Sequence, residues 1–474
     1  MKLFNLRLTT LKSKLYAIVF ASFVVRVVGF FLLPDKESTL GPDEGNYGEL
    51  TKWIAQGKPA DEYPYTTLYL ISRSLIVPAS LLNRLGVDGL SAVRVISSLY
   101  GLLTLCLAVS LFLKIANLRS EFAKWASNNQ MKVLVLFIIF GFLPSHLTWS
   151  ILGLRDSALE FWVMTIFALI FYIFEMKGKS SRLTLSGALL AILFAFSSRP
   201  QVGWVLGVTM LFYFSWKIRY RAAQILFPLT LVGIMLGYAA TTSNPFEKTE
   251  SFTVQLVKTN NSFKPSTQSQ FNVTLMCKFQ GQIIDTGDAK YKCSEKMAST
   301  TRWGAFNVFS AVVKQADAIP LRHELNKIDA ISVIETQNCP NTGASRVDRF
   351  FCIAYRAPYS TFTFLFRPLV GADVSSMSSL FAALENVFWL GAFFFVVVMF
   401  IRNRRLAFFG ALAPSLLFFS LYVLAAGAYE GNMGTAFRHK SLILWVVLLL
   451  MASTIVATQQ RRAERDGISG SSQE

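Results

Sequence analysis

The feature that most constrains this chain is a series of long, nearly uncharged apolar runs that recurs from one end to the other. The hydrocarbon core of a bilayer is about 30 Å thick, so a helix needs about 17–25 apolar residues to cross it. Hydrophobic residues make up 53% of the 474 residues and charged residues 16%, a balance that leaves too little polar surface for a soluble fold. We therefore expect an all-α polytopic membrane protein with about ten transmembrane helices. The predicted spans are 15–33, 90–113, 132–150, 157–175, 183–198, 201–216, 223–242, 378–401, 407–428 and 438–457.

Basic residues between the spans predict the orientation of the chain. Lys and Arg accumulate in the cytoplasmic loops of membrane proteins. When crossings are counted from the N-terminus, each loop assigned to the inside is basic, from Lys2–Lys14 before the first span to Arg461–Arg465 after the last. This pattern predicts a multi-pass protein of the cell membrane with both termini in the cytoplasm. The net charge of +18 follows from these loops and does not indicate a nucleic-acid partner, because no basic stripe with stacking aromatics lies outside the spans.

The same count places a domain-sized insertion on the outer side, between spans seven and eight. We expect an N-terminal transmembrane module (1–242), an external domain (243–376), and a C-terminal transmembrane module with a basic tail (377–474). Within the first external loop (34–89), we expect residues 66–85 to form an amphipathic helix that lies on the membrane surface. The four cysteines of the external domain predict two disulfides, with free thiols as the alternative. Four cysteines allow three pairings, and we favour the one that joins the first to the second and the third to the fourth. These cysteines are Cys277, Cys293, Cys339 and Cys352.

An acidic pair, Asp43 and Glu44, follows the first span. The flanking Gly41, Pro42 and Gly45 predict a defined turn just outside the bilayer. A carboxylate there could accept a proton from a hydroxyl group or bind a divalent metal ion, although two carboxylates are too few ligands to require one. The alternative is ordinary solvated charge.

Several charged residues at the predicted outer boundary form a candidate binding site. Arginines on the outer side are unexpected, because basic residues favour the cytoplasmic side. A guanidinium group can bind phosphate with paired donors. The alternative is that these side chains extend to the lipid headgroups. A carboxylate inside span eight is a functional candidate because its desolvation is costly. The predicted residues for a lipid phosphate and sugar are Arg94, Arg155, Asp156, Arg199, Arg367, Glu385, Arg438 and His439.

At these residues the chain resembles the GT-C class of integral-membrane glycosyltransferases, related in layout to the protein O-mannosyltransferase and aminoarabinose transferase families. The resemblance covers about the first 200 residues and rests on the acidic pair, the surface helix 66–85, and the motif Arg94-x-x-x-Ser98-x-x-Gly101 in span two. It implies a polyprenyl-phosphate-linked sugar donor and Asp43 as the catalytic base, with Glu44 as its substitute. The chain departs from this layout because its external domain interrupts the spans. Segments 154–157, 366–368 and 432–438 also resemble polysaccharide polymerases of the O-antigen type.

The leading hypothesis is an inverting glycosyltransferase that acts on the outer face of the membrane. Its partners are the lipid-linked donor, a glycan, lipid or protein acceptor, and membrane lipids. No certain cofactor follows from the sequence. Binding of a divalent metal ion at Asp43 and Glu44 is left open as an alternative. The alternatives are a lipid-linked polysaccharide polymerase or ligase, in which Asp43 is dispensable, and a lipid or solute transporter.

Overall fold

The structure is a computed structural model that describes most of the predicted membrane spans and part of the external segment. The chain divides into two compact units, one formed by Met1–Val232, Ala357–Gly427 and Met433–Glu474, the other by Gly233–Arg356 and Ala428–Asn432. The described residues are 2–32, 44–60, 72–118, 126–175, 181–217, 251–256, 284–285, 290–296, 346–371, 373–374, 377–402, 409–430 and 436–443.

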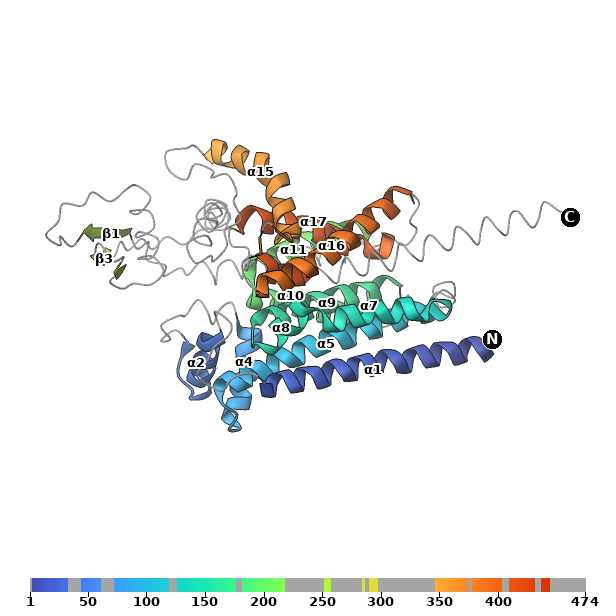
Figure 1. The fold of residues 1–474 in the computed structure, drawn as a ribbon. Coiled ribbons are helices and arrows are strands. Elements are labelled where there is room, and N and C mark those ends of the chain that lie inside the picture. The colour runs from blue at the N-terminus through green and yellow to red at the C-terminus, as the bar shows by residue number, and fades with distance from the viewer. Residues whose placement is uncertain are drawn as a thin grey trace. The chain divides into compact units, whose positions relative to one another are not determined.

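The predicted span 223–242 lies outside the described residues. Each of the other predicted spans is helical, in whole or in part, over its described residues. Three helical segments, Thr10–Leu32, Gly89–Lys114 and Gln130–Ile151, are long and apolar enough to cross a bilayer, so the chain is a multi-pass membrane protein. The first helices pack side by side, with α5 against both α1 and α9, and α9 against α10 (Figure 1). The helices are α1 (Lys2–Leu32), α5 (Gly89–Leu118), α7 (Gln130–Phe142), α8 (Pro144–Ile151), α9 (Arg155–Glu175), α10 (Ser181–Ser198), α11 (Pro200–Lys217), α16 (Met377–Arg402) and α17 (Phe409–Tyr429), with a further helix at 436–443.

The third predicted span is broken in two. We expected one helix over 132–150, but α7 ends at Phe142 and α8 begins at Pro144. Proline lacks the N–H that would continue the helix, and it is well accommodated at a first helical position. After α8, Gly153 adopts a φ of +67°, a left-handed conformation that glycine reaches without steric cost. This turn leads directly into α9 at Arg155.

The first external loop folds against the bundle as two helices, α2 (Glu44–Ala55) and α4 (Arg73–Arg84). Our prediction of a turn at Glu44 is wrong: Glu44 begins α2, where a carboxylate is favoured by the helix dipole. Asp43 lies outside the described residues. Part of the segment 66–85 forms a helix as predicted, α4, which buries Leu75 and Ile76 in a core shared with α2 and α5. Its place on the membrane surface stays a prediction.

The other unit contains a small antiparallel sheet. Strands β1 (Ser251–Leu256), β2 (Ile284–Asp285) and β3 (Lys290–Lys296) lie in the order β1-β3-β2, with Val254 opposite Cys293. Strand β1 alternates polar and apolar residues throughout, and β3 does so over its first four residues, which is the period of a strand. The all-α prediction therefore holds for the described spans, while the segment that we predicted to be external adds strands. Helix α15 (Arg346–Phe366) carries Cys352, which is disulfide-bonded; the pairing, and Cys277 and Cys339, lie outside the described residues.

Helix α17 approaches α15 closely at Gly427. A Cβ atom at this position would lie 2.9 Å from the backbone nitrogen of Thr361 and 3.0 Å from the carbonyl carbon of Ser360. We expect Gly427→Ala to lower the free energy of unfolding by about 1–3 kcal/mol, because backbone atoms cannot move aside as a flexible side chain can. The matched control is Gly391→Ala in α16, where a Cβ meets nothing within 4 Å. The thermal midpoint of the purified protein would measure both, and equal shifts would contradict this packing.

Candidate active site

Five of the predicted residues gather at one end of the helical bundle. Asp156, in the first turn of α9, is buried; its Oδ2 lies 3.1 Å from Nε of Arg438, and its Oδ1 lies 3.5 Å from Nη1 of Arg199. Arg155 acts electrostatically on the same carboxylate, and all three guanidinium groups act on buried His439. Among these side chains, positive charge exceeds negative charge. We name this set, Arg155, Asp156, Arg199, Arg438 and His439, the arginine cluster.

The ends of separate helices build the arginine cluster. Arg199 lies at the junction of α10 and α11, where its N–H donates to Ala195 and its carbonyl accepts from Val202 and Gly203. Arg438 belongs to the helix 436–443, and Asp156 follows the Gly153 turn. The ion pairs therefore bring the ends of α9, α10 and helix 436–443 together, as expected from the alternating crossings that placed these three ends on one side of the membrane.

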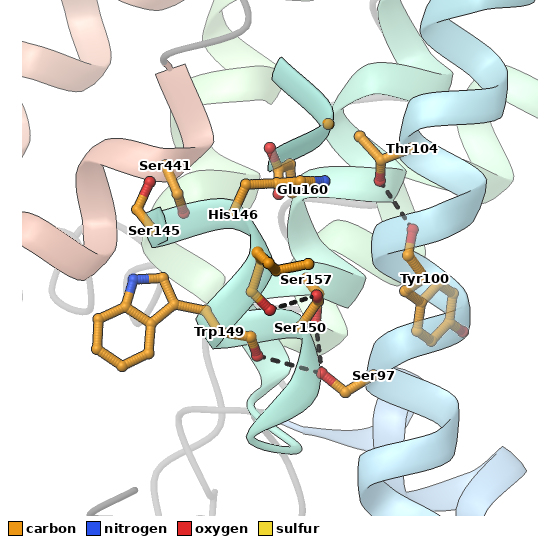
Figure 2. Close-up of polar contacts among 12 residues, drawn as sticks. Ser97, Tyr100, Thr104, Ser145, His146, Trp149, Ser150, Ser157, Glu160 and Ser441 are labelled. Atoms are coloured by element: carbon orange, nitrogen blue, oxygen red, sulfur yellow. Dashed lines mark hydrogen bonds and ion pairs between the residues drawn. The ribbon is translucent and has the colours of Figure 1, made fainter. Parts of the chain in front are cut away.

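Hydrogen bonds hold the turn before Asp156 against α5. Ser97 on α5 donates to the carbonyl of Leu154 at 3.0 Å, and its hydroxyl lies 2.6 Å from that of Ser157. Figure 2 shows Ser97 opposite Ser157 and Trp149. Buried polar groups that are satisfied in this way define one arrangement of the backbone. The cluster residue Asp156 thus stands on a rigid turn.

Arg94 and Glu44 form a buried ion pair with each other. Nε of Arg94 bonds Oε1 of Glu44, and both side chains are almost fully buried. The backbone of Arg94 lies against the Gly153 turn, because a Cβ on Gly153 would be 3.3 Å from the Arg94 nitrogen. Oε1 of Glu44 is thus engaged by Arg94, and the role of Glu44 as a substitute base stays a prediction. The contact fits a role in anchoring the start of α2 beside the turn that leads to Arg155.

Glu385 is confirmed as a buried carboxylate, and its contacts tie α16 to α8. Its oxygens accept from the Ser145 N–H at 2.9 Å, from the Ser145 hydroxyl at 2.6 Å, and from Nε1 of Trp389 at 3.1 Å. Ser145 lies in the first turn of α8, so Glu385 caps the beginning of that helix, where a negative charge is favoured. Its contacts are those of a helix cap, and they do not place it in the arginine cluster.

Lys440, next to His439, holds the end of α15. Its buried ammonium donates to the carbonyl of Arg367 at 2.6 Å and to Oδ1 of Asn386 at 2.7 Å. The Asn386 amide in turn donates to the carbonyl of Pro368 at 3.0 Å. Lys440 thus fixes the helix that carries Arg438 and His439 relative to α15 and α16. Lys440 was absent from our predicted set, although a lysine at the start of an apolar span is visible in the sequence.

The Arg367 side chain binds Asp373 instead of Asp156. Its Nε lies 3.0 Å from Oδ2 of Asp373 and its Nη2 bonds Oδ1, while the Leu369 N–H donates to the same carboxylate at 2.8 Å. The hydrogen bond from Arg367 lowers the pKa of Asp373. Arg367 thus stabilises the loop between α15 and α16, a structural contact that the phosphate-binding prediction did not foresee.

Further buried polar side chains lie inside the bundle, and sequence reasoning missed them. Arg26 on α1 donates from Nε to the Ser150 hydroxyl at 3.2 Å and from Nη1 to the Ser22 carbonyl at 3.2 Å. Nδ1 of His146 lies 2.9 Å from Oε2 of Glu160, and Figure 2 shows this pair on α8 and α9. Arg26 and Glu160 stand within otherwise apolar spans, which is the signal that could have identified them. No group of three His, Cys, Asp or Glu side chains is placed for a metal among the residues described.

The fold and the arginine cluster together define a multi-pass helical membrane protein with a buried, arginine-rich site at one end of its helical bundle. No protein-family model and no curated protein matches the chain. Among solved structures it is similar to ArnT from Cupriavidus metallidurans in the apo state, at 15% sequence identity and a TM-score of 0.36, over 92% of this chain and 77% of that chain.

Proposed function

We propose that the protein transfers a sugar from a polyprenyl-phosphate donor to an acceptor hydroxyl on the outer face of the membrane. The observation that carries this proposal is the arginine cluster, in which Arg155, Arg199 and Arg438 surround the buried Asp156. Charged groups at a membrane boundary are costly to bury, and such groups commonly serve substrates. The outer side follows from the basic loops that the charge rule assigns to the cytoplasm.

In this proposal the arginine cluster binds the phosphate of the donor. Asp156 pairs with two guanidinium groups and orients them, and the three arginines of the cluster outnumber its one carboxylate. Guanidinium groups bind phosphate oxygens with paired donors. When the bond between the anomeric carbon and the phosphate oxygen breaks, the phosphodiester becomes a monoester and gains negative charge. Fixed positive charge in a buried site stabilises that change most strongly in the transition state.

The proposed catalytic base is Asp43. It accepts the proton of the acceptor hydroxyl as the acceptor oxygen bonds to the anomeric carbon and the lipid phosphate leaves with the bonding electrons. A single displacement inverts the configuration of the sugar. Asp43 directly precedes Glu44, and the ion pair of Glu44 with Arg94 anchors that end of α2 beside the turn of Arg155. In this account Glu44 and Arg94 position the base.

Binding of the lipid phosphate tests the role of the cluster. We expect polyprenyl phosphate to raise the thermal midpoint of the purified protein, and neutral polyprenol of the same length to leave it unchanged. Arg199→Gln should weaken binding by about ten- to a hundredfold, because a hydrogen bond to a charged group contributes about 1.5–3 kcal/mol. The matched control is Arg84→Gln, which removes an exposed arginine of α4. Equal protection by polyprenol, or equal weakening by Arg84→Gln, would contradict the proposal.

A further inference from the structure

Helix α15 carries four exposed aromatic residues along one face: Phe351, which is 65% exposed, and the three that follow it. Tyr355 is 84% exposed, Tyr359 54% and Phe362 51%. Their spacing of four and three residues aligns them along a single side of the helix. We call these three residues the aromatic stripe. The stripe is distinct from the arginine cluster and plays no part in the proposed chemistry.

The opposite face of the last turns of α15 packs into the helical bundle. Ser360 and Phe364 are buried there, and Phe364 contacts the ring of Tyr422 on α17. The backbone at Ser360 meets α17 at Gly427, close to the end of that helix. The stripe residues Tyr359 and Phe362 therefore stand at the level where the bundle ends, and they point away from it.

The exposed apolar surface continues along the chain beyond α15. Leu369 and Val370 follow in the connecting loop, and Phe381 and Leu384 lie on the first turns of α16, all at least 40% exposed. Because α16 is a predicted span, its exposed apolar residues face lipid. The aromatic stripe is thus continuous in sequence with a lipid-facing surface.

We propose that the aromatic stripe lies in the interface between headgroups and acyl chains of the membrane in which the bundle sits. Tyrosine is enriched at this depth because its ring is apolar and its hydroxyl reaches the hydrated headgroups. A helix that carries apolar and aromatic side chains on its exposed face buries that face in this interface. The last segment before α16 is therefore anchored to the bilayer surface by α15.

Spin-label accessibility in reconstituted full-length protein tests this placement. Tyr355→Cys and Phe362→Cys would each be made in a Cys106→Ser background, since Cys106 is free, and labelled with a nitroxide. In liposomes of phosphatidylethanolamine and phosphatidylglycerol, we expect collisions with membrane-soluble oxygen to exceed those with a water-soluble nickel chelate at both positions. The matched control is Gln56→Cys, in an exposed turn after α2, where the nickel chelate should dominate. Protein with Cys106→Ser alone measures background labelling.

Two positions keep the test decisive if one variant fails to fold, because Tyr355 is the most exposed of the three and its replacement disturbs least. Oxygen dominance at either folded position supports the membrane location. Nickel dominance at the level of Gln56→Cys overturns it and would assign the stripe to a water-exposed partner such as a glycan chain. Because no turnover is measured, the result is independent of the proposed function.

Discussion

Replacing Asp156 by asparagine is expected to lower the free energy of unfolding by about 3–5 kcal/mol, since breaking a buried ion pair leaves an uncompensated charge. Asparagine keeps the size and shape of the side chain, so packing is unchanged. The carboxylate pairs with Arg438 at 3.1 Å and Arg199 at 3.5 Å in a buried setting. Without it, the buried Arg199 and Arg438 lose the negative charge that lies beside them.

Thermal or denaturant unfolding of the purified protein measures this effect. The control is Lys52→Met, which removes an exposed partner of Asp88 (3.0 Å) and should change stability by no more than about 1 kcal/mol. The double variant Asp156→Asn/Arg438→Gln should recover part of the loss, because it removes one of the uncompensated charges. A change for Asp156→Asn no larger than that for Lys52→Met would show that the cluster is not a coupled ionic unit.

Sequence alone predicted a multi-pass helical membrane protein, because apolar runs of span length follow directly from bilayer physics. The number of spans and their orientation stay predictions. The break between α7 and α8 was missed, although Pro144 marks it, since hydropathy averages over a whole span. Residues of the arginine cluster were identified individually from their outward positions. Their mutual contacts could not be predicted, because Asp156, Arg199 and Arg438 meet only when the ends of separate helices pack together.

Three of the predicted site residues, Glu44, Arg94 and Arg367, form ion pairs that the sequence did not predict. Glu44 and Arg94 are 50 residues apart, and each was assigned a direct part in the site; the structure joins them in one buried ion pair. Arg367 was placed with the phosphate-binding residues, but Asp373, six residues later, takes its guanidinium. In both cases the charge pattern identified the residue but not the partner, which depends on helix packing or on the path of a loop.

Asp43→Asn is expected to reduce turnover by about 10²–10⁴-fold, the usual contribution of a positioned general base. Donor binding should change little, because the arginine cluster holds the lipid phosphate. Glu44→Gln should behave differently. It leaves Arg94 buried without its carboxylate, so we expect lower thermal stability and a turnover loss within about tenfold in protein that remains folded.

The most direct test of the account is the release of free polyprenyl phosphate from a purified polyprenyl-phosphate sugar donor in the presence of an acceptor. We predict release by the wild-type protein, almost none by folded Asp43→Asn, and a strong reduction in folded Arg155→Ala. Full activity of Asp43→Asn with loss in Arg155→Ala would contradict the base and favour a lipid-linked polysaccharide polymerase. No release by wild-type protein across lipid-linked donors, with acceptors supplied, would contradict the transferase itself.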